Sequence, residues 1–270
     1  MMSSTATSPA LSHASVETLP APRALPSAGQ VFLSLFKADL TTQWRNRRAS
    51  LMVVLLPVVI VMSWKALIVK TGGAFVLANA ATLGLNAIGL MGYPTTVAKD
   101  RDKDIFQRLR VAPAPGWTIM GSRLAVQLVM ILFMTIVVFI VGYQYDGIVL
   151  PVTGYLAALL ASIAGGAVYL GLGQAIVGRI RNAETVTSTC RLIYIAFIMI
   201  GMFGELGMLG KYIDEITPYT PYGTVKTIVS SAMTPAQWNS SSTLALFITL
   251  GYTAVFTYAG IRWFKWSTKS

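Results

Sequence analysis

Residues 74–98 read AFVLANAATLGLNAIGLMGYPTTVA, a run of 25 residues that contains no charge. A single helix needs roughly 20 consecutive apolar residues to cross a hydrocarbon core about 30 Å thick. This run therefore predicts a membrane-spanning helix. Its polar residues Asn79, Asn86 and Tyr93 recur every seven positions, so they should lie near one stripe of that helix.

Five further segments have a comparable length and hydropathy. Leu124 to Tyr143 and Pro151 to Gly178 also contain no charge, whereas the first carries Lys65 and the fifth carries Glu205 near one end, where a charge is less costly. We therefore expect an all-α integral membrane protein in which residues 49–264 form six spans. The predicted spans are Leu51 to Val69, Ala74 to Ala98, Leu124 to Tyr143, Pro151 to Gly178, Leu192 to Gly210, and Leu244 to Ile261.

Composition supports a membrane protein and excludes several functions. The chain has 270 residues, of which 54% are hydrophobic and only 11% are charged, whereas about a quarter are charged in soluble domains. Cys190 is the sole cysteine and His13 the sole histidine, so we expect no bound metal and no cofactor. The pair Gly210-Lys211 lies outside any P-loop pattern, so we expect no ATP site on this chain and no enzymatic activity.

The basic residues are distributed unevenly across the predicted spans. They gather before the first span, between the second and third, between the fourth and fifth, and after the sixth. By the positive-inside rule, these segments and both termini should be cytoplasmic in a multi-pass protein of the bacterial cytoplasmic membrane. The net charge of +11 then reflects topology, and we expect no nucleic-acid partner. The opposite, external side holds Lys65, Lys70, Lys211 and Lys226.

Both ends of the chain lie outside the spans. Residues 1–29 are rich in Ser, Pro and Ala, which predicts a disordered tail, and residues 265–270 form a short cytoplasmic C-terminus. Between the tail and the first span, apolar residues recur at helical spacing, and this predicts an amphipathic helix over 30–48 in the cytoplasmic interface. The alternative is that this helix extends the first span. The apolar positions are Phe32, Leu33, Phe36, Leu40 and Trp44.

The segment 211–243 mixes aromatic and aliphatic residues with Pro218, Pro221, Gly223 and Pro235. Segments broken by Pro and Gly can dip into a bilayer where protein or a wet cavity shelters their backbone. We therefore predict two short re-entrant or interfacial helices on the external side, before the last span. A folded external loop with an aromatic belt is the alternative.

The loop 99–123 begins KDRDKDIFQRLRVAP, with charges of alternating sign followed by apolar residues at helical spacing. This pattern predicts a short surface helix that can dock against another protein, and Pro113 and Pro115 should end it. A solvated charged loop is the alternative.

The same loop resembles the coupling region of type 2 ABC exporter permeases, in which paired acidic and basic residues precede Leu-Arg and Pro. The matching residues are Asp100, Arg101, Asp102, Lys103, Arg108, Leu109, Arg110 and Pro113. The resemblance in layout extends over residues 30–264 and includes Pro57 in the first span. The chain departs from the pattern at Asp104, where the family often has Gly.

This resemblance implies a set of partners. Two permeases, either two copies or two paralogues, would assemble in membrane lipid, each on a separate ATP-binding subunit that carries ATP and Mg. The residues expected to contact that subunit are Asp100, Arg101, Asp102, Lys103, Asp104, Phe106, Arg108, Leu109 and Arg110. A second contact is expected at Arg179, Arg181 and Glu184, although the arginines there are equally explained by topology.

Four residues are candidates for the translocation path: Asn79, Asn86, Tyr93 and Glu205. Hydrogen bonds between helices are the alternative role of the first three, and an interfacial position is the alternative for Glu205. Expected cargo is hydrophobic or amphipathic, such as a drug, antibiotic or lipid-like molecule. Export of a lipid-linked glycan, or an ATP-independent channel or secondary carrier, are the other functions considered.

Overall fold

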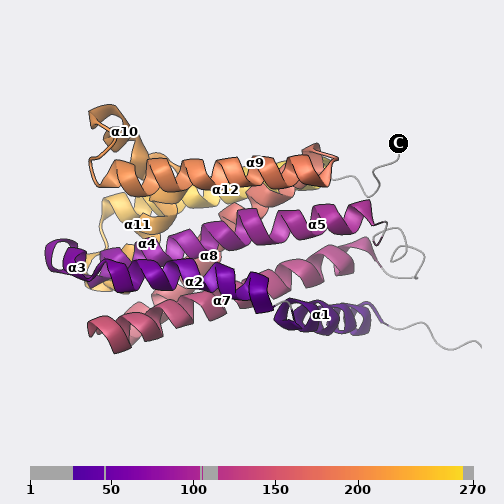
Figure 1. Ribbon diagram of the computed structural model, residues 1–270, viewed down its shortest axis with the longest axis horizontal. Helices are drawn as coiled ribbons and strands as arrows, with labels where there is room; N and C mark the ends of the chain where they lie inside the picture. Colours follow the sequence, from indigo (N-terminus) through magenta and orange to yellow (C-terminus); the bar gives the residue numbers. More distant parts are fainter. Residues whose placement is uncertain (1–26, 46, 104, 106–114, 264–270) are drawn as a thin grey trace, which may run out of the picture.

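The computed structural model describes residues 27–45, 47–103, 105 and 115–263, and the regular elements in these ranges are all helices (Figure 1). The predictions of a disordered tail and a short C-terminus fall wholly or largely outside these ranges. So do five of the expected coupling residues: Asp104, Phe106, Arg108, Leu109 and Arg110.

Five helical stretches in the described ranges are long and apolar enough to span a membrane, and they correspond to the second to sixth predicted spans. One is continuous through three elements, α4, η1 and α5. The stretches are α4 (Gly73–Asn86) with η1 (Ala87–Gly92) and α5 (Tyr93–Asp102), α7 (Gly116–Asp146), α8 (Val152–Arg179), α9 (Ala183–Ile198) with η2 (Met199–Phe203), and α12 (Ser240–Trp263).

The first predicted span is a bent pair of helices, α2 (Arg47–Ser63) and α3 (Lys65–Thr71), which meet at 66° and give a sixth span if counted together. Trp64 lies between them with φ −93° and ψ 19°, outside helical geometry. Immediately after the bend, the Lys65 ammonium lies 5.1 Å from the ring centroid of Tyr145 and donates to the Tyr145 carbonyl at 3.4 Å. The bend thus begins where the chain places a charge beside the end of α7.

The two ends of the bundle differ. Figure 1 shows α1 (Ala28–Arg45) beside the first part of α7, at the end of the bundle where α5 ends, whereas α3 and α10 (Lys211–Ile216) lie at the far end of the molecule. We call the end that holds α1, the last turn of α5 and the connection between α8 and α9 the basic end, because these three segments carry Lys and Arg side chains. Helix α1 covers most of the segment 30–48, whose amphipathic character stays a prediction, and Phe32 on it stacks on Trp117 of α7 at 6.3 Å between ring centroids. Its position in a membrane interface remains a prediction.

The π-helical stretch η1 in the second span has a local cause. Pro94 lies two residues after it and has no N–H to donate, and its ring would clash with the carbonyl four residues earlier in a regular helix. The widened turn brings Gly89 against the backbone of α8 at Tyr169, where a Cβ would overlap it. Gly173 on α8 faces the Gly89 carbonyl in turn, so glycines on both helices allow close packing here.

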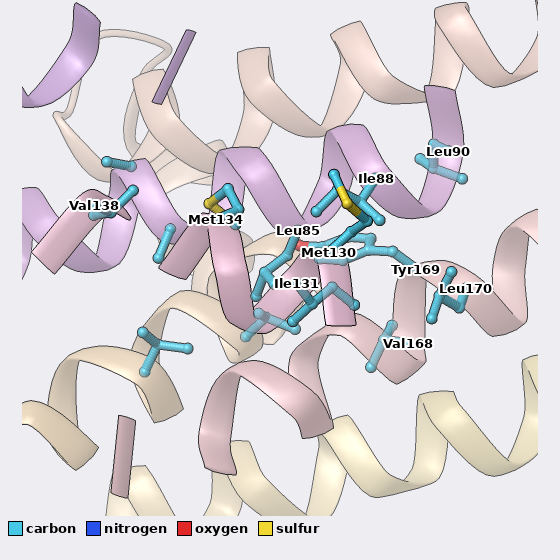
Figure 2. Packing of buried hydrophobic residues seen from close by; sticks show 14 of the residues in the cluster. Leu85, Ile88, Leu90, Met130, Ile131, Met134, Val138, Val168, Tyr169 and Leu170 are labelled. Atoms are coloured by element: carbon cyan, nitrogen blue, oxygen red, sulfur yellow. The ribbon is translucent and has the colours of Figure 1, made fainter. Parts of the chain in front are cut away.

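The core forms where α4, η1, α7 and α8 converge (Figure 2). Leu85 and Ile88 from the second span meet Met130 and Ile131 from α7, and Tyr169 of α8 reaches in beside them. All five are buried, at 3% exposed or less. Interdigitation of this kind fixes the register of the three longest spans, so residues at their ends hold defined positions.

The broken segment before the last span contains two helices, α10 and α11 (Pro221–Met233), joined by a 3₁₀ turn (Thr217–Tyr219). Most of α11 is buried, and it packs against α4, α8 and α12. Thr220 caps its N-terminus by accepting from the Gly223 N–H at 3.1 Å, and Pro221 occupies the first turn. The re-entrant character of α10 and α11 relative to a membrane remains a prediction.

Candidate functional site

Arg101 joins the two connections expected to contact the ATP-binding subunit. It lies in the last turn of α5 and is only 2% exposed. Its Nη1 donates to the Val177 carbonyl at 2.8 Å, and its Nη2 donates to the carbonyls of Ile180 and Arg181 at 2.7 Å each. These carbonyls belong to the end of α8, where backbone acceptors lack helical partners. Arg101 therefore caps α8 from a neighbouring span.

Asp100 faces the other way, toward α7. Its carboxylate forms a salt bridge with Arg123 at 2.6 Å, and both side chains are largely buried. On α1, the Asp39 carboxylate accepts from the Ser122 hydroxyl at 3.1 Å. Asp39, Asp100 and Arg123, together with Tyr93, line a small cavity of about 120 Å³ between α1, α5 and α7. We call Asp39, Asp100, Ser122 and Arg123 the charged cluster.

Burial raises the pKa of Asp39 above its ordinary value of 3.8, although the Arg123 charge and the Ser122 hydrogen bond oppose the shift. A carboxyl with a higher pKa in the folded chain than in the unfolded chain loses folding stability as the pH rises through this range. We therefore expect Asp39→Asn to raise the melting temperature at pH 7 and to have a smaller effect near pH 4. Thermal unfolding of the purified protein across this pH range measures it, and a gain that grows toward low pH would contradict the assignment.

The remaining coupling candidates that the structure describes are on the surface. Asp102 and Lys103 are exposed at the end of α5. Across the junction made by Arg101, Arg179 and Glu184 are exposed as well, and Glu184 lies in the first turn of α9, which Asn182 caps. The structure thus brings both expected contact regions to one surface.

The stripe Asn79, Asn86 and Tyr93 is buried within the bundle, at most 1% exposed. The Tyr222 hydroxyl of α11 lies 3.4 Å from the Asn79 side-chain oxygen, and the Asn86 amide reaches the Tyr194 carbonyl at 3.5 Å. These are contacts between helices, as the alternative role of hydrogen bonding between helices requires. The Asn86 side-chain oxygen is buried without a hydrogen-bond partner.

Tyr93 makes the shortest of these contacts, since its hydroxyl donates to the Gln174 side-chain oxygen at 2.5 Å. Tyr93→Phe removes this donor and leaves the Gln174 oxygen unpaired, so we expect a loss of about 1 kcal/mol in unfolding free energy. Combining it with Gln174→Leu should cost less than the sum of the two single changes. Unfolding equilibria of the three variants measure this. Tyr212→Phe, at a side chain 85% exposed, is the control; strict additivity would contradict the pairing.

Glu205 lies at the far end of the bundle, beyond η2, and forms an ion pair with Lys226 of α11. The Lys226 side chain is 8% exposed, and its ammonium also lies 4.4 Å from the ring centroid of Phe75. Glu205 therefore contacts the broken segment, which neither of its predicted roles had anticipated. Its contribution to a cargo exit remains a prediction.

Several partners of the site residues were not singled out from the sequence, namely Asp39, Arg123 and Lys226. Arg123 and Lys226 were counted only among the basic residues that indicate topology, and Asp39 was given no role. A weak signal was available for Arg123, because it directly precedes the uncharged run 124–143, where a charge is costly without a partner. Within the described residues, no group of three or more His, Cys, Asp or Glu side chains is placed to hold a metal ion.

A comparison with protein families identifies the family to which this chain is similar. The model of the ABC-2 type transporter family, a permease domain and not a catalytic one, matches residues 30–222. The search of curated proteins finds no match. The matched region contains α1, the first five spans and the charged cluster. Because it covers well over half of the 270 residues, the chain belongs to the ABC-2 type transporter family and is a membrane-spanning permease subunit.

Proposed function

We propose that this permease is an exporter subunit whose basic end is cytoplasmic and binds a separate ATP-binding subunit. The observation that carries the proposal is the Arg101 junction, because it links the end of α5 to the end of α8 through three hydrogen bonds. Two connections far apart in the sequence then form one rigid surface. A partner that presses on either connection displaces both.

The proposed contact surface consists of exposed charged residues on each side of that junction: Asp102, Lys103, Arg179, Arg181 and Glu184. Closure of two ATP-binding subunits would push on this surface, and the Asp100–Arg123 pair would pass the displacement to α7. A nucleotide shifts the conformational equilibrium only if the complex with nucleotide favours one state. The buried ion pair and the Arg101 junction supply the stiff connections that such a shift needs.

Transport would require a second permease, identical or paralogous, with the path between the two. Asn79 and Asn86 remain the proposed path residues, since small movements of η1 or η2 would expose their amides. The described spans offer an otherwise apolar interior, so we propose a hydrophobic or amphipathic cargo.

Charge reversal on the surface, without touching Arg101, tests the partner contact. We expect Lys103→Glu combined with Arg179→Glu to weaken copurification with the ATP-binding subunit about tenfold, because reversed charges repel their partners at the interface. The loss should be partial, because exposed charges contribute less to affinity than buried contacts do. The matched control reverses two exposed lysines at the other end, Lys70→Glu with Lys211→Glu. Quantitative pull-down from detergent-solubilised membranes measures the effect. Equal loss in both double variants would count against a contact at the basic end.

A further inference from the structure

A large groove opens on the side of the bundle between α7, α8 and α12, and Tyr93 forms part of its wall. Its volume is about 720 Å³, within the range of about 300 to 1,000 Å³ that is usual for small-molecule sites. Leu124 and Leu128 of α7 face Ala167 and Leu170 of α8 across it, and Thr257 contributes from α12.

Among the residues that the structure describes, the side chains that line this groove carry no charge. Two polar groups of its wall, the Tyr93 hydroxyl and the Gln174 amide oxygen, are hydrogen-bonded to each other. A ligand with a charge or several polar groups would lose hydration in this groove without gaining partners. An apolar chain would gain free energy for each methylene that it buries.

The groove reaches the basic end, since Trp117 in the first turn of α7 and Ile261 in the last turn of α12 line it. Trp117 lines it and is 62% exposed, as a tryptophan at a membrane interface would be. Three of the helices that wall the groove, α5, α8 and α12, carry an exposed basic residue in the last turn at that end. These residues are Lys99, Arg179 and Arg262. An anionic headgroup is the complement of this charge, and the apolar wall is the complement of its chain.

We propose that the groove binds one acyl chain of an anionic membrane phospholipid, with the headgroup at the basic end. Gly121 and Gly171 both line it. A Cβ at Gly121 would meet Phe32 at 3.5 Å and Trp117 at 3.8 Å, which is ordinary contact, so a longer side chain at this lining position takes up space beside Trp117 in the groove wall. At Gly171, a Cβ would already lie 3.1 Å from the Thr257 hydroxyl, so this glycine lets α8 approach α12 closely. The site belongs to this chain alone and does not rest on the ATP-binding partner.

The test uses the full-length protein in nanodiscs that contain phosphatidylcholine, with a trace of phosphatidylglycerol carrying a photoreactive group on one acyl chain. After illumination, mass spectrometry maps the labelled peptides. We expect label concentrated on residues 116–128 and 167–174, with at least about fivefold less when the labelled lipid is phosphatidylcholine. Gly121→Leu should reduce this labelling at least about fivefold.

Two further variants separate filling of the groove from damage to the fold. Ala167→Leu fills the same groove from α8 and should have the same effect, which keeps the test valid if Gly121→Leu fails to fold. Gly251→Leu adds the same side chain on α12, where a Cβ meets nothing within 4 Å, and should leave labelling unchanged.

Three results would overturn the proposal. The first is label spread evenly over all exposed apolar helices and insensitive to Gly121→Leu, which indicates ordinary surrounding lipid only. The second is equal labelling by the two lipids. The third is rapid disulfide formation between two copies carrying Leu124→Cys, which would show that a second permease covers the groove.

Discussion

Replacing Arg101 by Met is expected to lower the unfolding free energy by about 3 to 5 kcal/mol, the largest effect of any single change considered. The substitution keeps most of the apolar stem but leaves the carbonyls of Val177, Ile180 and Arg181 without their donor. Hydrogen bonds from a charged donor contribute about 1.5 to 3 kcal/mol each, and buried acceptors left unpaired cost more than exposed ones.

Two variants test this explanation. Arg101→Lys keeps the charge but cannot span three acceptors with a planar fork, so it should lose part of the stability. Lys103→Met removes a basic residue two positions later, where the side chain is exposed, and should change stability by less than about 0.5 kcal/mol. Unfolding in mixed micelles under increasing denaturant measures all three. Wild-type stability in Arg101→Met would show that the carbonyls do not depend on it.

Replacing Lys226 by Met is expected to cost about 3 kcal/mol, because it leaves the Glu205 carboxylate without its partner. The substitution also removes the ammonium that lies over the Phe75 ring. Removing one partner of a buried pair is strongly destabilising, whereas replacing both with neutral side chains is often close to neutral. The double variant Lys226→Met with Glu205→Gln should therefore recover most of the loss, to within about 1 kcal/mol of the wild type.

The same unfolding measurement applies, and Lys211→Met at the same end of the bundle is the control for removing an exposed lysine. A double variant as unstable as Lys226→Met alone would contradict the pairing, since the defect would then come from lost packing of the lysine stem.

Hydropathy predicted most of the fold, because the bilayer restricts spanning segments to long apolar helices. The spans 74–98, 124–143 and 151–178 correspond closely to the helices that the structure contains. The sequence did not indicate the bend at Trp64, because no Pro or Gly lies there; in the structure, Lys65 contacts Tyr145 directly after the bend. The π-helical stretch before Pro94 had a sequence signal that was not used.

The site was predicted less completely, for a different reason. Sequence pattern locates charges along the chain but does not say which of them are buried. Asp100, Arg101 and Asp102 are consecutive and look equivalent in the sequence, yet their partners differ: Asp100 pairs with α7, Arg101 caps α8, and Asp102 is exposed. Helical rotation of about 100° per residue separates them, and the neighbouring spans that receive each side chain become known only from the packing.

Site-specific photo-cross-linking in the assembled transporter tests most directly whether the basic end binds the ATP-binding subunit. A benzophenone amino acid replaces Lys103 in one strain and Lys211 in another, both exposed and at opposite ends of the bundle. After illumination, cross-linked partners are identified by mass spectrometry. We expect peptides of the ATP-binding subunit cross-linked to position 103 and none cross-linked to position 211. Cross-links to that subunit from position 211, with position 103 unlinked in an intact complex, would contradict it.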